Sequence, residues 1–465
     1  MKADLCILGA GSAGLSVAAA AAKLGRRVVL IEKGDMGGDC LNHGCVPSKS
    51  LLAAAARAQA FRTAAALGIG PSEPKVDVGA VMAHVHRVIA DIAPEDSEAR
   101  FRAMGCHVIR APGKFVAPDR VEAGGELIEA RRFVIATGSR PRLPEIAGLA
   151  AVAYLTNETV FSLTELPDHL LVLGGGPVGV EMAQAWRRLG AKVTLLQSGP
   201  RLLMREDAEL SAVVEQRLQA EGVEIRKTAH VLAVHPGVRL ELQGGERITG
   251  SHLLLATGRK ATVDGLGLAA AGIRHTAAGI PVDGAFRTSN RRVYAIGDVT
   301  GDWQFTHVAN YQAGLVIRHA LFRLPVRFRP EILPRVTYSD PELAQLGLTE
   351  AEADARGIPV RISRFAFARS DRARAMGNTE GLVKVLAGPR GRILGVGIVG
   401  PEAGELVAPW ALAMHKRLKL SDMAGMVAAY PTLAEAGRRA ALDYYTPMAE
   451  KRWVRWLLDF LARFG

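Results

Sequence analysis

Apolar runs of strand length alternate with helical segments over the first two thirds of the chain, which predicts an α/β fold with parallel sheets. The run DLCILGA (4–10) leads into a glycine-rich turn, an alanine-rich segment (15–25) and a second apolar run within RRVVLIEK (26–33). The predicted order is strand, turn, helix and strand. The same order returns at 170–199, LLVLGGGPVGVEMAQAWRRLGAKVTLLQSG, so the unit is duplicated.

Both units carry the glycine spacing G-x-G-x-x-G of a dinucleotide-binding turn. The first glycine permits the tight turn, the second lets the backbone approach a pyrophosphate, and the third lets the helix pack on the strand. Glu32 ends the second strand of the first unit and is placed to accept hydrogen bonds from ribose hydroxyls, whereas the second unit has Gln197 there. The glycines are Gly9, Gly11 and Gly14, then Gly174, Gly176 and Gly179.

Shorter repeats extend this organisation. FVIATGSRP (133–141) and LLLATGRKA (253–261) both end an apolar run in Ala-Thr-Gly, and VYAIGDVTG (293–301) ends one in Gly-Asp. Asp298 is placed either to meet a sugar-like hydroxyl or to make a turn. After about residue 330 the pattern changes to glycine-containing strands and helices, which predicts an α+β interface module. The predicted domains are a discontinuous nucleotide-binding domain (1–150 and 282–330), a second one (151–281), a dimerisation domain (331–450) and a C-terminal helix (451–465).

Composition adds little to this picture. Hydrophobic residues make up 49% and charged residues 22%, and the net charge of +12 comes from scattered positive residues rather than a basic tail. We therefore expect no nucleic-acid partner, and we attribute the positive charge mainly to the overall amino-acid composition rather than to a binding surface. No apolar run approaches the ~18 residues that cross a bilayer, and we expect no cleaved signal and a cytoplasmic location.

Two of the four cysteines, Cys40 and Cys45, have only four residues between them in a glycine-containing stretch, which indicates redox chemistry or a metal site. Two thiolates and His43 give three ligands, and a structural zinc site wants four, so redox chemistry is favoured and no metal is expected. Cys6 and Cys106 lie in apolar runs and are expected to be structural.

The stretch GGDCLNHGCVPSK (37–49) resembles the redox motif GGxCxNxGCxPSK of the pyridine nucleotide-disulfide oxidoreductases, the flavoenzymes that include dihydrolipoamide dehydrogenase, glutathione reductase and mercuric reductase. The order of the other motifs is also similar, from about residue 3 to about residue 445. The resemblance implies FAD in the first domain, NAD(P)H in the second, a homodimer with a shared active site, and a redox disulfide between Cys40 and Cys45.

The resemblance also implies residue roles. Cys45 would lie next to the flavin, Cys40 would exchange with a disulfide substrate, and Lys49 would pair with Glu181 beside the isoalloxazine. The other residues expected at FAD are Gly9, Gly11, Ser12, Ala13, Gly14, Glu32, Lys33, Gly38, Asp39, Gly113, Ala136, Thr137, Gly138, Gly297, Asp298, Phe305, Thr306 and His307. Those expected at NAD(P) are Gly174, Gly176, Pro177, Val178, Gly179, Glu181, Gln197 and Gly258.

The chain departs from the family near its C-terminus. Dithiol-using members carry His-Pro-x-x-x-x-Glu, but here the segment reads AAYPTLAEAG, with Tyr430 in place of the histidine and Glu435 retained. An unperturbed histidine titrates near pH ~6.5 and a tyrosine near ~10, so the phenol is a poor base at neutral pH. Tyrosine here resembles mercuric reductase, although the C-terminal cysteine pair of those enzymes is missing. His43, three residues after Cys40 on the same expected helical run, is either a substitute acid/base or a solvated capping residue.

Two further expectations concern the nicotinamide and the C-terminus. Without an acid at Gln197, NADPH is favoured over NADH, with Arg201 the nearest candidate for a 2′-phosphate. The segment MAEKRWVRWLLDFLARFG (448–465) predicts a basic amphipathic helix, which either packs on the interface domain or contacts a membrane peripherally. Its apolar and basic positions are Trp453, Trp456, Leu457, Phe460, Leu461 and Phe464, with Lys451, Arg452, Arg455 and Arg463. A redox-regulated flavoprotein that binds such a partner is the non-enzymatic alternative.

Overall fold

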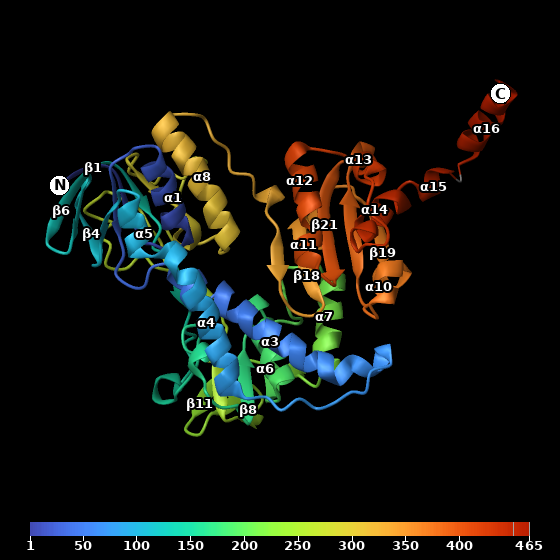
Figure 1. Cartoon of the computed structure of the whole chain (residues 1–465), viewed down its shortest axis with the longest axis horizontal. Coiled ribbons are helices and arrows are strands. Elements are labelled where there is room, and N and C mark those ends of the chain that lie inside the picture. The colour runs from blue at the N-terminus through green and yellow to red at the C-terminus, as the bar shows by residue number, and fades with distance from the viewer. Residues whose placement is uncertain (450, 465) are drawn as a thin grey trace.

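The first sheet of the computed structural model, which describes residues 1–449 and 451–464, confirms the predicted parallel unit. Strand order is β3-β2-β1-β6-β5-β4, with β16 also paired to β6. β1 runs parallel to β2 and β6, and α1 and α8 lie side by side over one face (Figure 1). The elements are β1 (Lys2–Leu8), α1 (Ser12–Lys23), β2 (Val28–Ile31), α5 (Glu98–Ala103), β3 (His107–Ile109), β4 (Gly113–Ala117), β5 (Arg120–Ala123), β6 (Glu126–Ile135), β16 (Val293–Ala295) and α8 (Thr306–Phe322).

The chain returns to this first sheet earlier than the predicted boundary at residue 282. Val263, Leu266 and Ile280 are buried in the same core cluster as the opposite face of the sheet. The amide of Phe115 also donates to the carbonyl of Leu266 at 2.9 Å. Apolar packing thus moves residues 261–281 from the second unit to the first. The crossing is made by the antiparallel pair β7 (Ser139–Pro141) and β15 (Arg259–Ala261).

The second unit repeats the architecture with a four-stranded parallel sheet in the order β10-β9-β8-β14. A three-stranded antiparallel sheet, β11-β12-β13, closes one face. The elements are β8 (His169–Leu173), α6 (Pro177–Leu189), β9 (Lys192–Leu196), α7 (Ala208–Ala220), β10 (Glu224–Arg226), β11 (Val231–His235), β12 (Arg239–Leu242), β13 (Arg247–Thr249) and β14 (His252–Leu255).

Two helices from the first part of the chain, α3 (Cys45–Thr63) and α4 (Val78–Asp96), pack on the second unit. Leu51 and Ala55 of α3 share a core cluster with Trp186 of α6, and all three are fully buried. α3 begins at Cys45, directly after the short α2 (Gly38–Asn42). This packing therefore holds the cysteine pair at the junction of the two units.

The third unit is the expected α+β domain, a five-stranded antiparallel sheet in the order β17-β18-β21-β20-β19. Helices cover the sheet around the buried Trp410. Its elements are β17 (Arg335–Thr337), β18 (Glu342–Gly347), α9 (Glu350–Ala355), β19 (Arg361–Ala366), α10 (Asp371–Ala375), β20 (Leu382–Ala387), β21 (Ile393–Gly400), α11 (Ala403–Leu406), α12 (Ala408–Lys416), α13 (Leu420–Gly425) and α14 (Ala434–Asp443). Short 3₁₀ helices are η1 (Ala64–Leu67), η2 (Leu149–Ala151), η3 (Val160–Ser162), η4 (Gly297–Thr300), η5 (Pro330–Ile332), η6 (Phe367–Arg369) and η7 (Pro389–Gly391).

The C-terminal helix forms but does not pack on the interface domain, so the packed alternative is wrong for the isolated chain. α15 (Thr446–Ala449) is followed by α16 (Arg452–Leu461) and η8 (Ala462–Phe464). No residue of α16 is buried, and the helix extends away from the body (Figure 1). Its aromatic side chains contact one another, Trp456 with Phe460 and Phe460 with Phe464. Among the described residues no helix is long and apolar enough to cross a membrane.

A buried ion cluster ties the second unit to the third. Lys384 of β20, 2% exposed, donates to Asp207 at 2.9 Å and to Glu350 at 2.5 Å. Asp207 also caps the N-terminus of α7. Removing one partner from a buried ion pair leaves an uncompensated charge in the interior, which is strongly destabilising.

We predict that Lys384→Met lowers the free energy of unfolding by about 3–5 kcal/mol, because Asp207 then lies buried and unpaired. The fall is measured as a shift of the urea midpoint. Lys416→Met, which changes an exposed lysine of the same domain, is the matched control and is expected to shift it little. Equal shifts in the two variants would contradict the role of the cluster.

Candidate active site

One cavity of about 1960 Å³ runs between the three units and holds most of the residues predicted from the sequence. It extends from the first glycine turn past Cys40 and Cys45 to the second glycine turn, and Tyr338 of the third unit also lines it. Of the predicted set, the lining includes Gly9, Gly11, Ser12, Ala13, Glu32, Lys33, Gly38, Asp39, His43, Lys49, Gly113, Ala136, Thr137, Gly138, Gly174, Gly176, Pro177, Val178, Glu181, Gln197, Gly258, Gly297, Asp298, Phe305, Thr306 and His307.

The two remaining glycines, Gly14 and Gly179, lie behind the lining and act in packing. A Cβ on Gly14 would stand 1.8 Å from the carbonyl oxygen of Gly9, and one on Gly179 would stand 1.8 Å from that of Gly174. Only glycine lets these helices approach the preceding turn so closely. This is the role predicted for the third glycine of each turn.

The donor set of both turns fits a dinucleotide. α1 begins after Gly11 and α6 after Gly176, and neither residue offers a side chain to cap the helix. The first backbone N–H groups of each helix therefore have no side-chain acceptor at the cap, and the positive end of each helix dipole faces the cavity. A pyrophosphate satisfies both requirements. The first turn fits FAD and the second fits NAD(P)H.

Glu32 and Gln197 occupy equivalent places at the ends of β2 and β9. Glu32 accepts from the amide of Ala10 at 2.6 Å, and Gln197 accepts from the amide of Gly175 at 2.9 Å. The expectation that Arg201 meets a 2′-phosphate is wrong in this structure. Its guanidinium donates to the carbonyls of Leu203, Met204 and Glu206 and to the hydroxyl of Ser211, which holds the following loop together.

The two cysteines lie together as free thiols and share one hydroxyl. Thr306 Oγ1, in the first turn of α8, donates to Cys40 Sγ at 3.0 Å and lies 3.6 Å from Cys45 Sγ. The hydrogen bond from the Cys40 thiol lowers the pKa of Cys45 to about 6, helped by the Thr306 hydroxyl and the charge of Lys49 against the opposing effect of burial. The same bond, with burial, raises the pKa of Cys40. Both directions favour the thiolate at Cys45 and the thiol at Cys40.

An ion pair stands one helical turn beyond Cys45. Lys49 Nζ lies 2.8 Å from Glu181 Oε2. The other carboxylate oxygen of Glu181 accepts from the amide of Tyr338 at 2.9 Å, and Lys49 Nζ lies 4.4 Å from the centre of the Tyr338 ring. Helices α3 and α6 and the third unit thus meet at this point.

A second polar network borders the cavity on the other side. Arg259 lies 3.2 Å from Asp39 and donates to Ser139, whose hydroxyl donates to Asp298 at 2.6 Å. Asn157 donates to Asp39 at 2.9 Å. Burial raises the pKa of Asp298, opposed by the bond from Ser139 and the charge of Arg259.

His43 is not on the same helical run as Cys40, contrary to the expectation. Helix α2 ends at Asn42, and His43 is its C-cap with φ −139°. The break arises because Gly44 takes φ −119° and ψ −111°, which no helix allows, before α3 begins. His43 lines the cavity but has the position of a capping residue.

Tyr430 and Glu435 lie outside the cavity of their own chain. Tyr430 is 71% exposed, and its hydroxyl donates to Asp371 at 3.3 Å. Within the described part of the chain, no side-chain hydrogen bond joins Tyr430 to Glu435. The hydroxyl of Tyr430 is thus engaged by Asp371 of its own chain.

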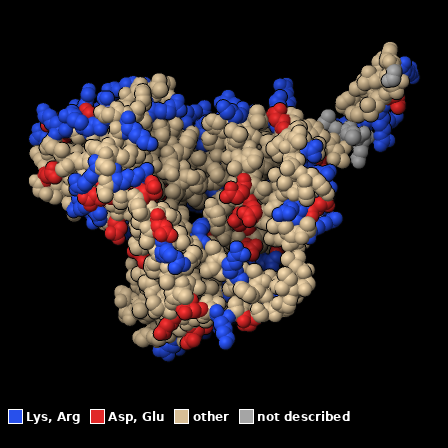
Figure 2. Space-filling view, viewed as in Figure 1, with Lys and Arg blue, Asp and Glu red and all other residues tan. Residues whose placement is uncertain are grey.

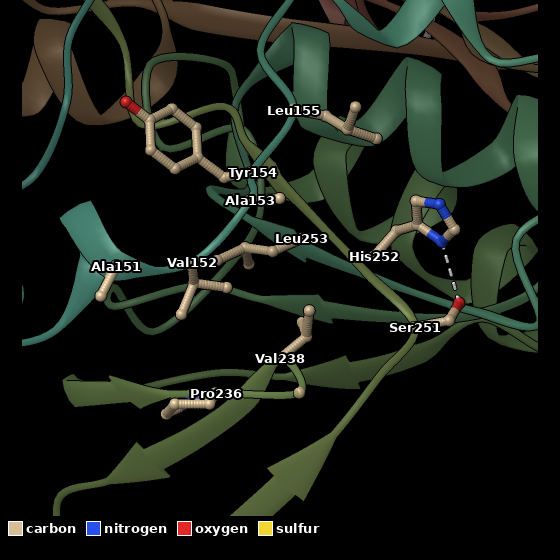
Figure 3. Close-up of a pocket in the computed structure, with 11 residues that line it drawn as sticks. Ala151, Val152, Ala153, Tyr154, Leu155, Pro236, Val238, Ser251, His252 and Leu253 are labelled. Carbon is tan, nitrogen blue, oxygen red and sulfur yellow. Dashed lines mark hydrogen bonds between the residues drawn. The ribbon is translucent and has the colours of Figure 1, made fainter.

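A smaller pocket of about 350 Å³ lies in the second unit (Figure 3). Its lining is mostly apolar, from residues 151–155, 236–238 and 251–253, with His252 Nδ1 3.0 Å from the Ser251 hydroxyl. None of the predicted site residues lines it. Among the described residues no group of three or more His, Cys, Asp or Glu could hold a metal ion.

Sequence reasoning missed several residues of the large cavity. Arg259 follows the second Ala-Thr-Gly, so the repeat itself could have pointed to it. Thr306 was expected at FAD, but nothing in the sequence placed its hydroxyl at both sulfurs. Asn157 and Tyr338 come from segments without any motif.

Comparisons with known proteins agree with this geometry. Residues 3–313 match the family described as pyridine nucleotide-disulphide oxidoreductase, and residues 333–441 match the dimerisation domain of that family. A mercuric reductase of Streptomyces lividans is 35% identical over 461 residues, covering 96% of this chain and 97% of that protein. A dihydrolipoyl dehydrogenase of Bacillus subtilis is 32% identical over 450 residues, covering 94% and 98%.

Solved structures include the Cu(II) complex of RclA, an HOCl-induced flavoprotein disulfide reductase of Escherichia coli. It is 27% identical, with a TM-score of 0.84 over 94% of this chain and 98% of that chain. In this chain the match to the dimerisation domain follows the match that contains the cysteine pair and both nucleotide turns. The chain belongs to the pyridine nucleotide-disulphide oxidoreductase family, and it is an FAD-dependent oxidoreductase that uses NAD(P)H.

Proposed function

We propose that this enzyme reduces a disulfide or a related thiol-reactive substrate at the Cys40–Cys45 pair. The observation that carries the proposal is the placement of both sulfurs at one hydroxyl, that of Thr306, in the cavity that runs between the two glycine turns. Bound FAD supplies hydride acceptance from NAD(P)H and two-electron reduction of the Cys40–Cys45 disulfide. Cys45 is assigned to the flavin side and Cys40 to the substrate side.

The thiol step moves two electrons from the cysteine pair to the substrate. The sulfur of Cys40 attacks one sulfur of the substrate disulfide and breaks that bond, and the departing sulfur takes up the proton that Cys40 loses. The thiolate of Cys45, which accepts a hydrogen bond from Cys40, then attacks the sulfur of Cys40 and leaves the Cys40–Cys45 disulfide. The second substrate sulfur leaves as a thiolate and is protonated by water.

The working form in this proposal is a homodimer in the cytoplasm. Tyr430 and Glu435 lie outside the cavity of their own chain, which supports their entry into the partner's site. A peripheral membrane contact through residues 451–465 belongs to the same proposal. Gln197 carries no negative charge against a 2′-phosphate, which supports NADPH, although Arg201 is already engaged by backbone carbonyls.

A second candidate is reduction of a soft metal ion such as Hg(II) at the same sulfurs. Two observations favour it: a phenol stands at position 430, and a metal ion needs no proton from that residue. The similarity to a mercuric reductase points the same way. In this case the metal ion is substrate, held by the thiolates and reduced by two electrons.

A substrate panel separates the two candidates. NADH and NADPH consumption is measured with lipoamide, glutathione disulfide, an aromatic disulfide and Hg(II). We expect disulfide turnover by the wild type and its loss, by at least about 10³-fold, in Cys40→Ser, because the attacking sulfur is gone. Cys106→Ser changes a buried cysteine outside the site and is expected to keep full activity. Turnover with Hg(II) alone would establish the second candidate, and no turnover with any oxidant would favour the regulatory flavoprotein.

The state of Cys45 predicts a pH dependence. Its thiolate is present above about pH 6 and is lost as the pH falls through that value. Thr306→Val removes a hydroxyl that stabilises the thiolate, so the midpoint is expected to move upward by about one pH unit. Ultraviolet thiolate absorbance of the reduced protein measures the titration, with Thr300→Val, on the neighbouring η4, as the control. An unmoved midpoint in Thr306→Val would remove Thr306 from this role.

Tyr430→His is predicted to raise turnover of lipoamide at neutral pH by at least about 10-fold, since an imidazole with a pKa near ~6.5 can take the proton that the phenol cannot. Steady-state rates between pH 6 and 9 measure the effect. Tyr430→Phe, which has neither group, is the matched comparison. If the two variants behave alike, residue 430 takes no part in proton transfer.

A further inference from the structure

The C-terminal helix carries exposed apolar side chains that the redox site does not use. Trp456 is 67% exposed, Leu458 60% and Phe464 75%, and the main contacts of α16 are with its neighbours in the chain, α15 and η8. A soluble protein rarely leaves so many large apolar side chains together in water unless they meet a partner. The question is which partner fits both the apolar and the charged positions.

Aromatic and charged residues occupy two separate stripes of the helix. Trp453, Trp456, Phe460 and Phe464 follow helical spacing, with Trp456 stacked on Phe460 at 5.8 Å and Phe460 against Phe464 at 5.2 Å. The leucines continue the apolar face on the far side of this aromatic stripe. The other stripe is polar and consists of Arg452, Arg455, Asp459 and Arg463.

The charge of the segment selects the partner. Lys451 and three arginines against the single Asp459 give residues 451–464 a net charge of +3. A second copy of the chain has a net charge of +12, so it would repel this positively charged segment. A nucleic acid would use the arginines and leave the leucine face in water. An anionic bilayer satisfies both faces, because its phosphates meet the arginines and its acyl region takes the leucines.

The geometry fits a helix lying in the surface rather than crossing it. α16 has ten residues, a length of ~15 Å against a hydrocarbon core of ~30 Å. Trp456 lies at the boundary of the polar and apolar faces, next to Arg463, where an indole N–H reaches the headgroups while its ring stays apolar. Figure 1 shows the helix held away from the body, and Figure 2 shows Lys and Arg beside its apolar surface.

We propose that residues 451–464 dock the enzyme on an anionic phospholipid surface, with the Trp453–Phe464 stripe at headgroup level and Arg452, Arg455 and Arg463 on the phosphates. This inference concerns where the enzyme works and does not depend on the substrate of its cysteine pair. Docking leaves the redox site intact, since no residue of α16 lines the cavity.

The test is flotation of the full-length holoenzyme with vesicles of phosphatidylcholine, with and without one part in about four of phosphatidylglycerol. We expect binding to the anionic vesicles, at least about tenfold weaker binding to the neutral ones, and release by salt. Arg455→Gln and Arg463→Gln are each expected to weaken binding about fivefold. Asp459→Asn, the matched change of opposite sign, is expected to strengthen it about fivefold. Trp456→Ala with Phe460→Ala keeps the charge and is expected to weaken binding at least about tenfold, which pure charge attraction would not show.

Activity in solution with a soluble oxidant is expected to be unchanged in all these variants and in the chain ended at residue 449, which shows that they fold. The proposal is overturned if the shortened chain binds vesicles as well as the full chain does. It is also overturned if the charge variants bind alike, or if shortening changes the sedimentation mass while vesicle binding stays absent, since a second copy is then the partner.

Discussion

The ion pair between Lys49 and Glu181 is the constraint on which the site depends. Glu181 is almost fully buried in α6, and a buried carboxylate is stable only if it is paired and hydrogen-bonded, which Lys49 and the amide of Tyr338 achieve together. Because Lys49 lies one turn after Cys45 on α3, the pair that neutralises Glu181 also fixes the cysteine helix against the second unit. The same lysine favours the thiolate of Cys45. The Lys49–Glu181 ion pair therefore fixes α3 against the second unit, and its lysine also stabilises the Cys45 thiolate.

Residues whose role is set by local backbone geometry could be predicted from the sequence. The glycine turns are one case, since a Cβ at Gly14 or Gly179 would collide with the carbonyl of the residue five positions earlier in the chain. The same holds for the parallel strands, the helices that follow them and the antiparallel third unit. Each of these elements has a hydrophobic periodicity that can be recognised in consecutive residues. The pairing of Lys49 with Glu181, which joins α3 to α6, was implied by the family resemblance and by no local pattern.

What escaped prediction depends on contacts between distant segments. Thr306 reaches the sulfurs only because α8 packs on α1, which brings residue 306 beside residues 40 and 45. The sequence does not show what the side chain of Arg201 contacts. In the structure its guanidinium donates hydrogen bonds to backbone carbonyls of the loop that follows it. The predicted domain boundary at residue 282 depends on distant contacts in the same way. Val263, Leu266 and Ile280 are apolar and could pack on either sheet, and only their packing in the structure assigns them to the first.

The substitution at residue 430 changes what the sulfur pair must do for itself. In a dithiol-using enzyme with histidine at this position, the imidazole can accept and donate the protons, and the cysteines need only transfer electrons. Here the phenol is engaged by Asp371, so in the proposed mechanism the proton of Cys40 passes to the departing substrate sulfur. The Cys45 thiolate, stabilised by Lys49 and Thr306, is too weak a base to hold that proton at neutral pH, but it binds a soft metal ion well. A polarised pair suits oxidants that need no proton, such as a soft metal ion, better than oxidants whose reduction requires proton transfer. This explains how one site resembles both a disulfide reductase and a metal-ion reductase.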